Sequence, residues 1–322
     1  MKSKMKYTAV IRTLGTAGEK YQQLLNSLQQ QSIQPNDIIV YIAEGYPLPK
    51  ETIGKERYVY VKKGMVAQRA LRYDEVQTEY MLFLDDDVFL PPTAVEILYR
   101  ELQEMCGDVI SPDVFPNSSR PLVSELLMML SGRMRARRGD EKWGYMVMRN
   151  AGYSYNKNPK GVLQSQTNAG PCFFCKKKDF LKIEFQEELW LDKQKYPLGE
   201  DQVMFYKMHK KGLRVLTSYD SGILQLDAGS SRISEEREKR IIFSDFRFKT
   251  IFWHRFIYRC EASFLLKIWD IMCIGYALSF ALLISLIKGQ FDVFKLKIDA
   301  ISDGIAFIKS EEYLKLPTIN KL

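Results

Sequence analysis

Apolar and polar residues alternate along the first part of the chain in blocks that predict strands and helices in turn. Apolar runs typical of buried strands span Lys6–Leu14, Asp37–Ala43, Arg57–Val61 and Tyr80–Leu84. Helical spacing of apolar residues predicts helices over Glu19–Gln31 and over Met65–Val76, the second opening after Gly64. Strands and helices that alternate in this way predict the α/β class, with a doubly wound, mostly parallel sheet.

Adjacent carboxylates follow the fourth predicted strand directly, at Asp85, Asp86 and Asp87. Such groups repel one another and lose solvation when half buried, so they persist most easily where a cation or ligand compensates them. Hard oxygen ligands at a strand end suit Mg²⁺ or Mn²⁺ carrying a phosphate group. Ligands of such sheets bind beyond the carboxyl ends of the strands, where Glu44 would also lie. A solvated acidic turn is the alternative.

A second acidic pair, Glu200 and Asp201, stands just before a predicted helix over Gln202–Lys211, which Gly212 ends. A carboxylate at a helix amino terminus is stabilised in its ionised form. Asp201 is therefore expected to be able to accept a proton at neutral pH. Alternatively, both acids only balance the helix dipole.

Composition narrows the class of protein. With 322 residues, of which 46% are hydrophobic, the chain can form one large domain plus an appendage. The net charge of +8 indicates anionic partners, but an acidic central site argues against nucleic acid. The start of the chain lacks an apolar core of signal-peptide length, so we expect the amino-terminal part to stay in the cytosol.

The 5 cysteines are scattered, which is typical of reduced thiols. Cys172 and Cys175 form a C-x-x-C, but the chain has no second pair and only 2 histidines to complete a zinc site. We expect a buried strand over Pro171–Cys175, with the two thiols on opposite faces.

The carboxy-terminal segment suggests a membrane. Ile241–Trp269 mixes aromatic with basic residues, which is typical of a helix in a headgroup region. Ile271–Ile287 carries no charge, and its roughly 17 residues would reach about 25 Å, the lower limit for spanning a bilayer core. We expect insertion from the cytosolic side, either monotopic or as a hairpin with Phe291–Ile308. The alternative is a buried helix that packs on a partner subunit, as in a homodimer.

A basic cluster follows the apolar segment Leu122–Leu130 and consists of Arg133, Arg135, Arg137 and Arg138. It is either a solvated loop or a contact for an anionic lipid or an acceptor's diphosphate.

The motifs, in this order, resemble those of the nucleotide-diphospho-sugar glycosyltransferases of GT-A fold, specifically the large inverting family 2, over roughly Lys6–Ser231. The matching positions are Thr13 at the end of the first strand, Glu44 near the nucleoside, Arg69 near the nucleotide, Asp85, Asp86 and Asp87 as the Asp-x-Asp motif, and Glu200 and Asp201 as the Glu-Asp motif. The chain departs from the family at Gln68 and Ala70, which flank Arg69 where the family has alanine and asparagine.

The resemblance implies a GT-A catalytic domain over residues 1–231 and a helical, membrane-associating region over 232–322. It implies Mn²⁺ or Mg²⁺ held by Asp85 and Asp87, with Asp227 as a third ligand where many GT-A enzymes have a histidine. Asp201 would act as the base, beside Glu200, in an inverting transfer from a nucleotide-diphospho-sugar, most commonly a UDP-sugar. The membrane segment and the resemblance together imply a lipid-linked glycan acceptor and the cytoplasmic face of a bacterial inner membrane, as in surface-polysaccharide assembly.

Two other functions stay open. A sugar nucleotidyltransferase would need a glycine-rich, lysine-bearing signature near the first strand, which the residues from Thr13 to Lys20 match poorly. A non-catalytic membrane-associated scaffold could keep both acidic motifs, and only activity excludes it.

Overall fold

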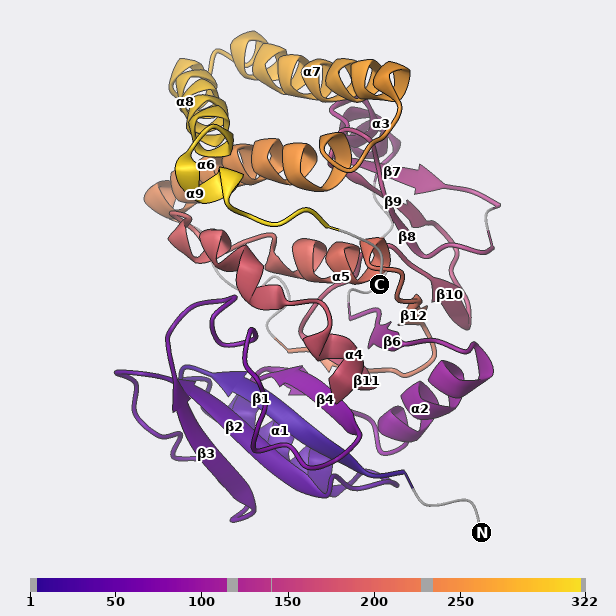
Figure 1. Cartoon of the computed structure of the whole chain (residues 1–322). Coiled ribbons are helices and arrows are strands. Elements are labelled where there is room, and N and C mark those ends of the chain that lie inside the picture. Colours follow the sequence, from indigo (N-terminus) through magenta and orange to yellow (C-terminus); the bar gives the residue numbers. More distant parts are fainter. Residues whose placement is uncertain (1–4, 115–120, 140, 227–233, 320–322) are drawn as a thin grey trace.

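The computed structural model describes residues 5–114, 121–139, 141–226 and 234–319, and an 8-stranded sheet lies at its centre (Figure 1). The strands follow the order β10-β12-β6-β11-β4-β1-β2-β3. Their bounds are β1 (Tyr7–Thr13), β2 (Asp37–Ala43), β3 (Glu56–Val61), β4 (Tyr80–Asp85), β6 (Val109–Pro112), β10 (Val162–Gln164), β11 (Cys172–Lys176) and β12 (Val215–Ser218).

Most neighbouring strands of this sheet are parallel. β1 pairs in parallel with β2 and β4, β2 with β3, and β6 with β12. β11 runs antiparallel between β4 and β6, and β10 is antiparallel to β12. The predicted α/β class with a mostly parallel sheet is therefore confirmed. The register places Arg12 beside Asp85, which brings the carboxyl ends of β1 and β4 together.

Helices cover both faces of the sheet. α1 (Glu19–Gln29) and α2 (Ala94–Glu104) share one core with the sheet, into which α1 buries Leu24, Leu25 and Leu28. η1 (Phe185–Lys193) and α5 (Glu200–Lys210) bury their apolar residues in the core of the other face. The sheet is thus doubly wound, as predicted. Cys172 and Cys175 lie in these two different cores, which confirms that their thiols occupy opposite faces of β11.

Smaller elements complete this part of the chain. They are β5 (Val88–Phe89), which pairs with β13 (Leu224–Gln225), a 3-stranded sheet of β7 (Met134–Arg137), β8 (Tyr145–Val147) and β9 (Tyr153–Asn156), and the helices α3 (Leu122–Leu130) and α4 (Lys177–Leu181). α3 buries none of its residues.

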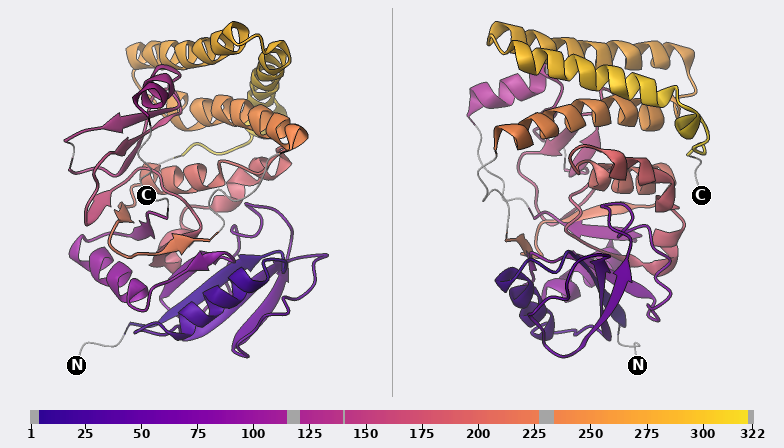
Figure 2. Two further views of the ribbon diagram at one scale, coloured as in Figure 1. Left: turned by 180° about the vertical axis from the view of Figure 1, so that it is seen from behind. Right: turned by 90° about the vertical axis from the view of Figure 1, so that its left-hand side faces the viewer.

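The carboxy-terminal part is helical, as predicted, and covers the side of α5 away from the sheet (Figures 1 and 2). It contains α6 (Glu235–Phe252), the π-helical η2 (Trp253–Tyr258), α7 (Phe264–Ile287), α8 (Phe291–Ile308) and α9 (Glu311–Leu314). Phe248, Ile251 and Phe252 of α6 lie in the same core as α5. α6 therefore packs on the α/β part of the chain through apolar residues, whereas we expected this segment to lie in a headgroup region.

Buried charges join the carboxy-terminal helices to α5. Glu188 of η1 is fully buried and accepts hydrogen bonds from Arg255 of η2, at 2.7 Å from Nη2, and from the indole of Trp190. Lys207 of α5 lies 3.0 Å from the same carboxylate. Burial alone would raise the pKa of Glu188, but the attraction of Lys207 and Arg255 outweighs it and lowers the pKa. Removing one partner would leave an uncompensated buried charge.

One predicted helix is absent. Residues 65–76 form turns and a loop instead of the helix expected over Met65–Val76. Asp192 of η1 accepts hydrogen bonds from the backbone N–H groups of Val66, at 2.8 Å, and Ala67, at 3.0 Å. The backbone then takes a positive φ of 57° at Tyr73, which cannot continue a helix. Val66, Tyr73 and Val76 are among the apolar residues of this segment, and the loop buries them in the core without forming a helix.

Candidate functional site

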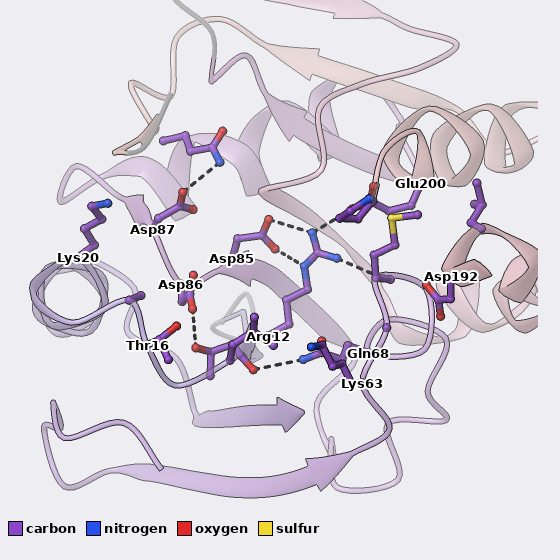
Figure 3. A pocket seen from close by; sticks show the side chains of 18 of the residues that line it. Arg12, Thr16, Lys20, Lys63, Gln68, Asp85, Asp86, Asp87, Asp192 and Glu200 are labelled. Carbon is purple, nitrogen blue, oxygen red and sulfur yellow. Dashed lines mark hydrogen bonds and ion pairs between the residues drawn. The ribbon is translucent and has the colours of Figure 1, made fainter. Parts of the chain in front are cut away.

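The acidic motifs meet at a cavity of about 760 Å³ beyond the carboxyl ends of β1 and β4 (Figure 3). Its lining includes Arg12, Thr13, Thr16, Lys20, Lys63, Gln68, Asp85, Asp86, Asp87, Asp192, Glu200 and Gln225. This volume lies within the usual range for small-molecule sites. Carboxylates and basic side chains together suit a ligand that carries phosphate groups and a cation.

Asp85 is held by arginine. Arg12 donates to both of its carboxylate oxygens, from Nε to Oδ1 and from Nη2 to Oδ2 at 3.0 Å. Arg69 donates to Oδ1 at 3.3 Å. Burial alone would raise the pKa of Asp85, but the attraction of Arg12 and then of Arg69 outweighs it and lowers the pKa. Asp85 is therefore an ionised anchor that positions the arginines.

Asp86 and Asp87 have other partners. The Thr13 hydroxyl donates to Asp86 Oδ2 at 2.5 Å, and the Gln225 amide donates to Asp87 Oδ2 at 3.1 Å. Burial, together with repulsion from Asp85 and Asp87, outweighs the Thr13 hydrogen bond and raises the pKa of Asp86 to about 6. A carboxylate in this position is one that a cation would stabilise in its ionised form.

The Glu-Asp motif opens α5. Gly199 precedes it in the left-handed conformation (φ 86°), and an added Cβ there would overlap the ring of Phe248 from α6. The close approach of α6 thus fixes the turn from which Glu200 and Asp201 project. Both acids lie in the first turn of the helix, where its dipole favours negative charge.

The two arginines connect this motif to β4. Arg12 Nη2 donates to Glu200 Oε1 at 3.1 Å. Arg69 is almost fully buried and donates from Nη1 to Asp201 Oδ1 at 2.5 Å and from Nη2 to the carbonyl of Gly170 at 2.6 Å. Burial and the neighbouring Asp201 raise the pKa of Glu200 despite the attraction of Arg12 and Arg69. Both motifs therefore belong to one network of charges.

Among the predicted site residues that the structure describes, five line the cavity: Thr13, Asp85, Asp86, Asp87 and Glu200. Arg69 and Asp201 are outside the lining and are joined to it through the hydrogen bond from Arg69 to Asp85. Glu44 follows β2 and is exposed, and within the described residues the cavity lining does not include it. Asp227, the predicted third metal ligand, lies outside the described residues. In the part of the chain that the structure describes, no group of three or more His, Cys, Asp or Glu side chains is arranged to hold a metal.

Sequence reasoning missed Arg12, Gln68 and Lys63. Arg12 had a visible signal, because it is the only charged residue in the strand Tyr7–Thr13. A charge within a buried strand requires a partner, and that partner is Asp85 on the neighbouring strand. Gln68 donates to the carbonyl of Thr13 at 3.2 Å, and no pattern in the sequence indicated this contact.

The donor set fits a divalent cation together with a phosphate ligand. Mg²⁺ is usually held by one or two carboxylates plus substrate phosphates and waters, so a group of three protein ligands is not required. Asp86 and Asp87 supply adjacent carboxylates at the cavity wall.

Comparisons with known proteins do not identify a family. No protein-family model matches this sequence, and no curated protein matches it.

Proposed function

We propose that this protein is an inverting glycosyltransferase of the GT-A type, which moves a sugar from a nucleotide-diphospho-sugar to a hydroxyl group. One observation carries the proposal: Arg12 binds both Asp85 at the end of β4 and Glu200 at the start of α5. It thereby joins the acidic motif that suits a diphosphate and its cation to the motif that suits a base, at one cavity.

The donor's diphosphate would lie at the carboxyl ends of β1 and β4. The resemblance implied Asp85 and Asp87 as the ligands of Mn²⁺ or Mg²⁺. Because Arg12 and Arg69 donate to the Asp85 carboxylate, Asp86 and Asp87 would hold the cation instead, while Asp85 keeps the arginines in place. The bound cation would supply charge stabilisation for the departing diphosphate. Lys20 and Lys63 line the same cavity and would add positive charge toward the phosphates (Figure 3).

Asp201 would take the proton from the acceptor hydroxyl. Its carboxylate accepts a hydrogen bond from Arg69 and lies in the first turn of α5. Attack from the face opposite the leaving group inverts the anomeric centre. Glu200 lines the cavity and pairs with Arg12, so its role would be to position the arginine between the two halves of the site.

The acceptor would be a lipid-linked glycan, reached from the cytoplasmic face of a bacterial inner membrane. α7 supports this part of the proposal, because it is a long apolar helix that leaves many large apolar residues exposed, as a helix in contact with a membrane would. UDP is the first donor nucleotide to test, since it is the commonest choice of the resembling family.

The test is calorimetric titration of UDP, GDP and dTDP, with and without Mn²⁺, into the wild type, Asp87→Ala and Asp201→Asn. We expect one nucleotide to bind only with Mn²⁺, with binding lost in Asp87→Ala and kept in Asp201→Asn. Transfer of the matching sugar should fall about 10²- to 10⁴-fold in Asp201→Asn, as for loss of a general base. If no nucleotide binds under any condition, the transferase proposal is wrong and a non-catalytic scaffold becomes the better explanation.

A further inference from the structure

The helices α3 and α7, which are far apart in the sequence, lie at the same end of the molecule (Figure 2). Both expose large apolar residues. We call this surface the apolar face. It comprises Leu122, Val123, Leu126, Leu127 and Met129 of α3, and Leu265, Trp269, Met272, Tyr276 and Leu283 of α7. These α7 residues recur at helical spacing and are 51–75% exposed. Other large apolar residues of α7 are exposed as well: Phe264, Leu266, Ile268, Ile271, Leu286 and Ile287. Exposed apolar surface of this extent marks an interaction site.

The opposite side of α7 is held by the rest of the chain at several points. Asp270 accepts a hydrogen bond from Arg149 at 2.7 Å. Farther along, Ala277 lies against Gly132, where an added Cβ would come within 3.0 Å of the alanine methyl group. Near the end, Lys297 of α8 donates to the Ser285 hydroxyl at 2.8 Å. From Asp270 to Ser285 the helix rises about 22 Å, so α7 lies along the protein over most of its length.

These contacts oppose a crossing of the bilayer by α7. A crossing would carry the ion pair of Asp270 or the polar contacts of Ser285, together with their partners, into a hydrocarbon core about 30 Å thick. An orientation parallel to the membrane keeps these polar groups on the protein side. The exposed stripe of α7 then enters one leaflet along its whole length.

Charged residues of both helices turn away from the apolar face. Glu125, the one charged residue of α3, accepts a hydrogen bond from Lys157 at 2.8 Å. In α7, Asp270 is fully buried, and the Lys267 ammonium group lies 5.5 Å from the centre of the Tyr258 ring. The face therefore consists of apolar side chains with the amphipathic rings of Trp269 and Tyr276, residue types that favour the membrane interface.

Exposed basic residues follow both helices of the apolar face in the sequence. Arg133, Arg135 and Arg138 follow α3 and are exposed, and Lys288 is exposed just after α7. Arg137, by contrast, donates to the carbonyls of Trp143 and Gly144 and belongs to the protein framework. Exposed basic side chains beside an apolar surface complement anionic lipid headgroups. A partner subunit with an equivalent face would place like charges against one another, which disfavours self-association.

We propose that α3 and α7 together dock this protein on an anionic bilayer, with α7 parallel to the membrane plane within one leaflet. α3 belongs to the catalytic half of the chain, so membrane contact is not confined to the carboxy-terminal helices. This inference does not depend on sugar transfer, because vesicle binding can be measured without any substrate.

The first test is flotation with vesicles of phosphatidylcholine alone and with phosphatidylglycerol added. We expect binding to the anionic vesicles, and we expect Leu126→Asp combined with Leu127→Asp to lower their partition constant about tenfold or more. These residues lie on a helix without buried residues, so the thermal melting of this variant should match the wild type. Leu48→Asp is the matched control, because Leu48 is 49% exposed outside the apolar face and its replacement should leave binding unchanged.

The second test measures the orientation of α7. Ala262→Cys and Gln290→Cys place single thiols at exposed positions beyond its two ends, in a background with Cys106, Cys260 and Cys273 replaced by alanine. Both thiols should react equally with a membrane-impermeant maleimide added outside vesicles that carry the protein. Protection of Gln290→Cys until detergent is added would show that α7 spans. The docking proposal is wrong if Leu126→Asp combined with Leu127→Asp binds anionic vesicles as well as the wild type does. It is also wrong if the wild type does not bind vesicles but forms a dimer that this variant dissociates.

Discussion

Replacing Arg69 by methionine tests the charge network most directly. The Arg69 side chain is only 3% exposed and donates to Asp201, Asp85 and the carbonyl of Gly170. Breaking a buried ion pair by removing one partner costs about 3–5 kcal/mol, because the remaining charge is left uncompensated. Asp85 and Asp201 are 20% and 30% exposed and keep part of their solvation, so we expect the lower end, about 3 kcal/mol.

The assay is urea unfolding of Arg69→Met beside Arg72→Met. Arg72 lies three positions along the chain, its side chain is 90% exposed, and its ion pair with Asp74 spans 3.8 Å, so its loss should cost less than about 1 kcal/mol. With a urea dependence of about 3 kcal/mol per molar, Arg69→Met should lower the midpoint by about 1 M.

A double-mutant cycle identifies the partner. In an Asp201→Asn background, Arg69→Met should cost less than in the wild type, by about 1.5–3 kcal/mol, as for a hydrogen bond to a charged group. Equal midpoints for Arg69→Met and Arg72→Met would refute the buried network. Strict additivity of the Arg69 and Asp201 changes would refute the ion pair between them.

Two further predictions follow from the structure. Gly170→Ala would place a methyl group on Asp201 Oδ1 and within 2.7 Å of Arg69 Nη1, so the Asp201 side chain must move. The rate of sugar transfer should fall about 10²-fold per ångström of this displacement. Gly275→Ala is the control and should keep wild-type activity, because no atom lies within 4 Å of the added methyl group. Burial and then Arg259 lower the pKa of His254 from 6.5 to about 4. The folded state then binds fewer protons than the unfolded state between these values, so stability should fall as pH drops through this range. Urea unfolding at pH 7 and pH 4.5 measures this loss of stability, which His254→Gln should remove. If the stability of His254→Gln falls as much between these pH values as that of the wild type, His254 is not its cause.

Local patterns were sufficient for several of the regular elements. β2 was predicted with its exact bounds, and β1, α1, β3 and α5 within two residues at each end, since each shows clear apolar spacing and distinct ends. The loop over residues 65–76 was missed because its decisive partner, Asp192, lies more than a hundred residues farther along the chain. A local sequence pattern cannot indicate a contact between residues that are so far apart in the chain.

The candidate site was partly predictable, because its acidic residues form recognisable local motifs. Adjacent acids at the end of β4 and at the start of α5 are visible as motifs, and the structure brings them to one cavity. The division of roles within Asp85, Asp86 and Asp87 was not visible. It depends on the strand register, which sets Arg12 beside Asp85, and on Thr13 and Gln225, which hold the other two.

The antiparallel position of β11 has a consequence for how the chain reaches its native state. β4 and β6 are not neighbours in the sheet, because β11, which is synthesised well after both, separates them. Until β11 arrives, each of these strands has an unsatisfied edge that could pair with another chain. Closing the centre of the sheet requires contacts of high sequence separation, which slow folding. The middle of the sheet is thus assembled late. An amino-terminal fragment ending before β11 would lack the strand that joins β4 to β6.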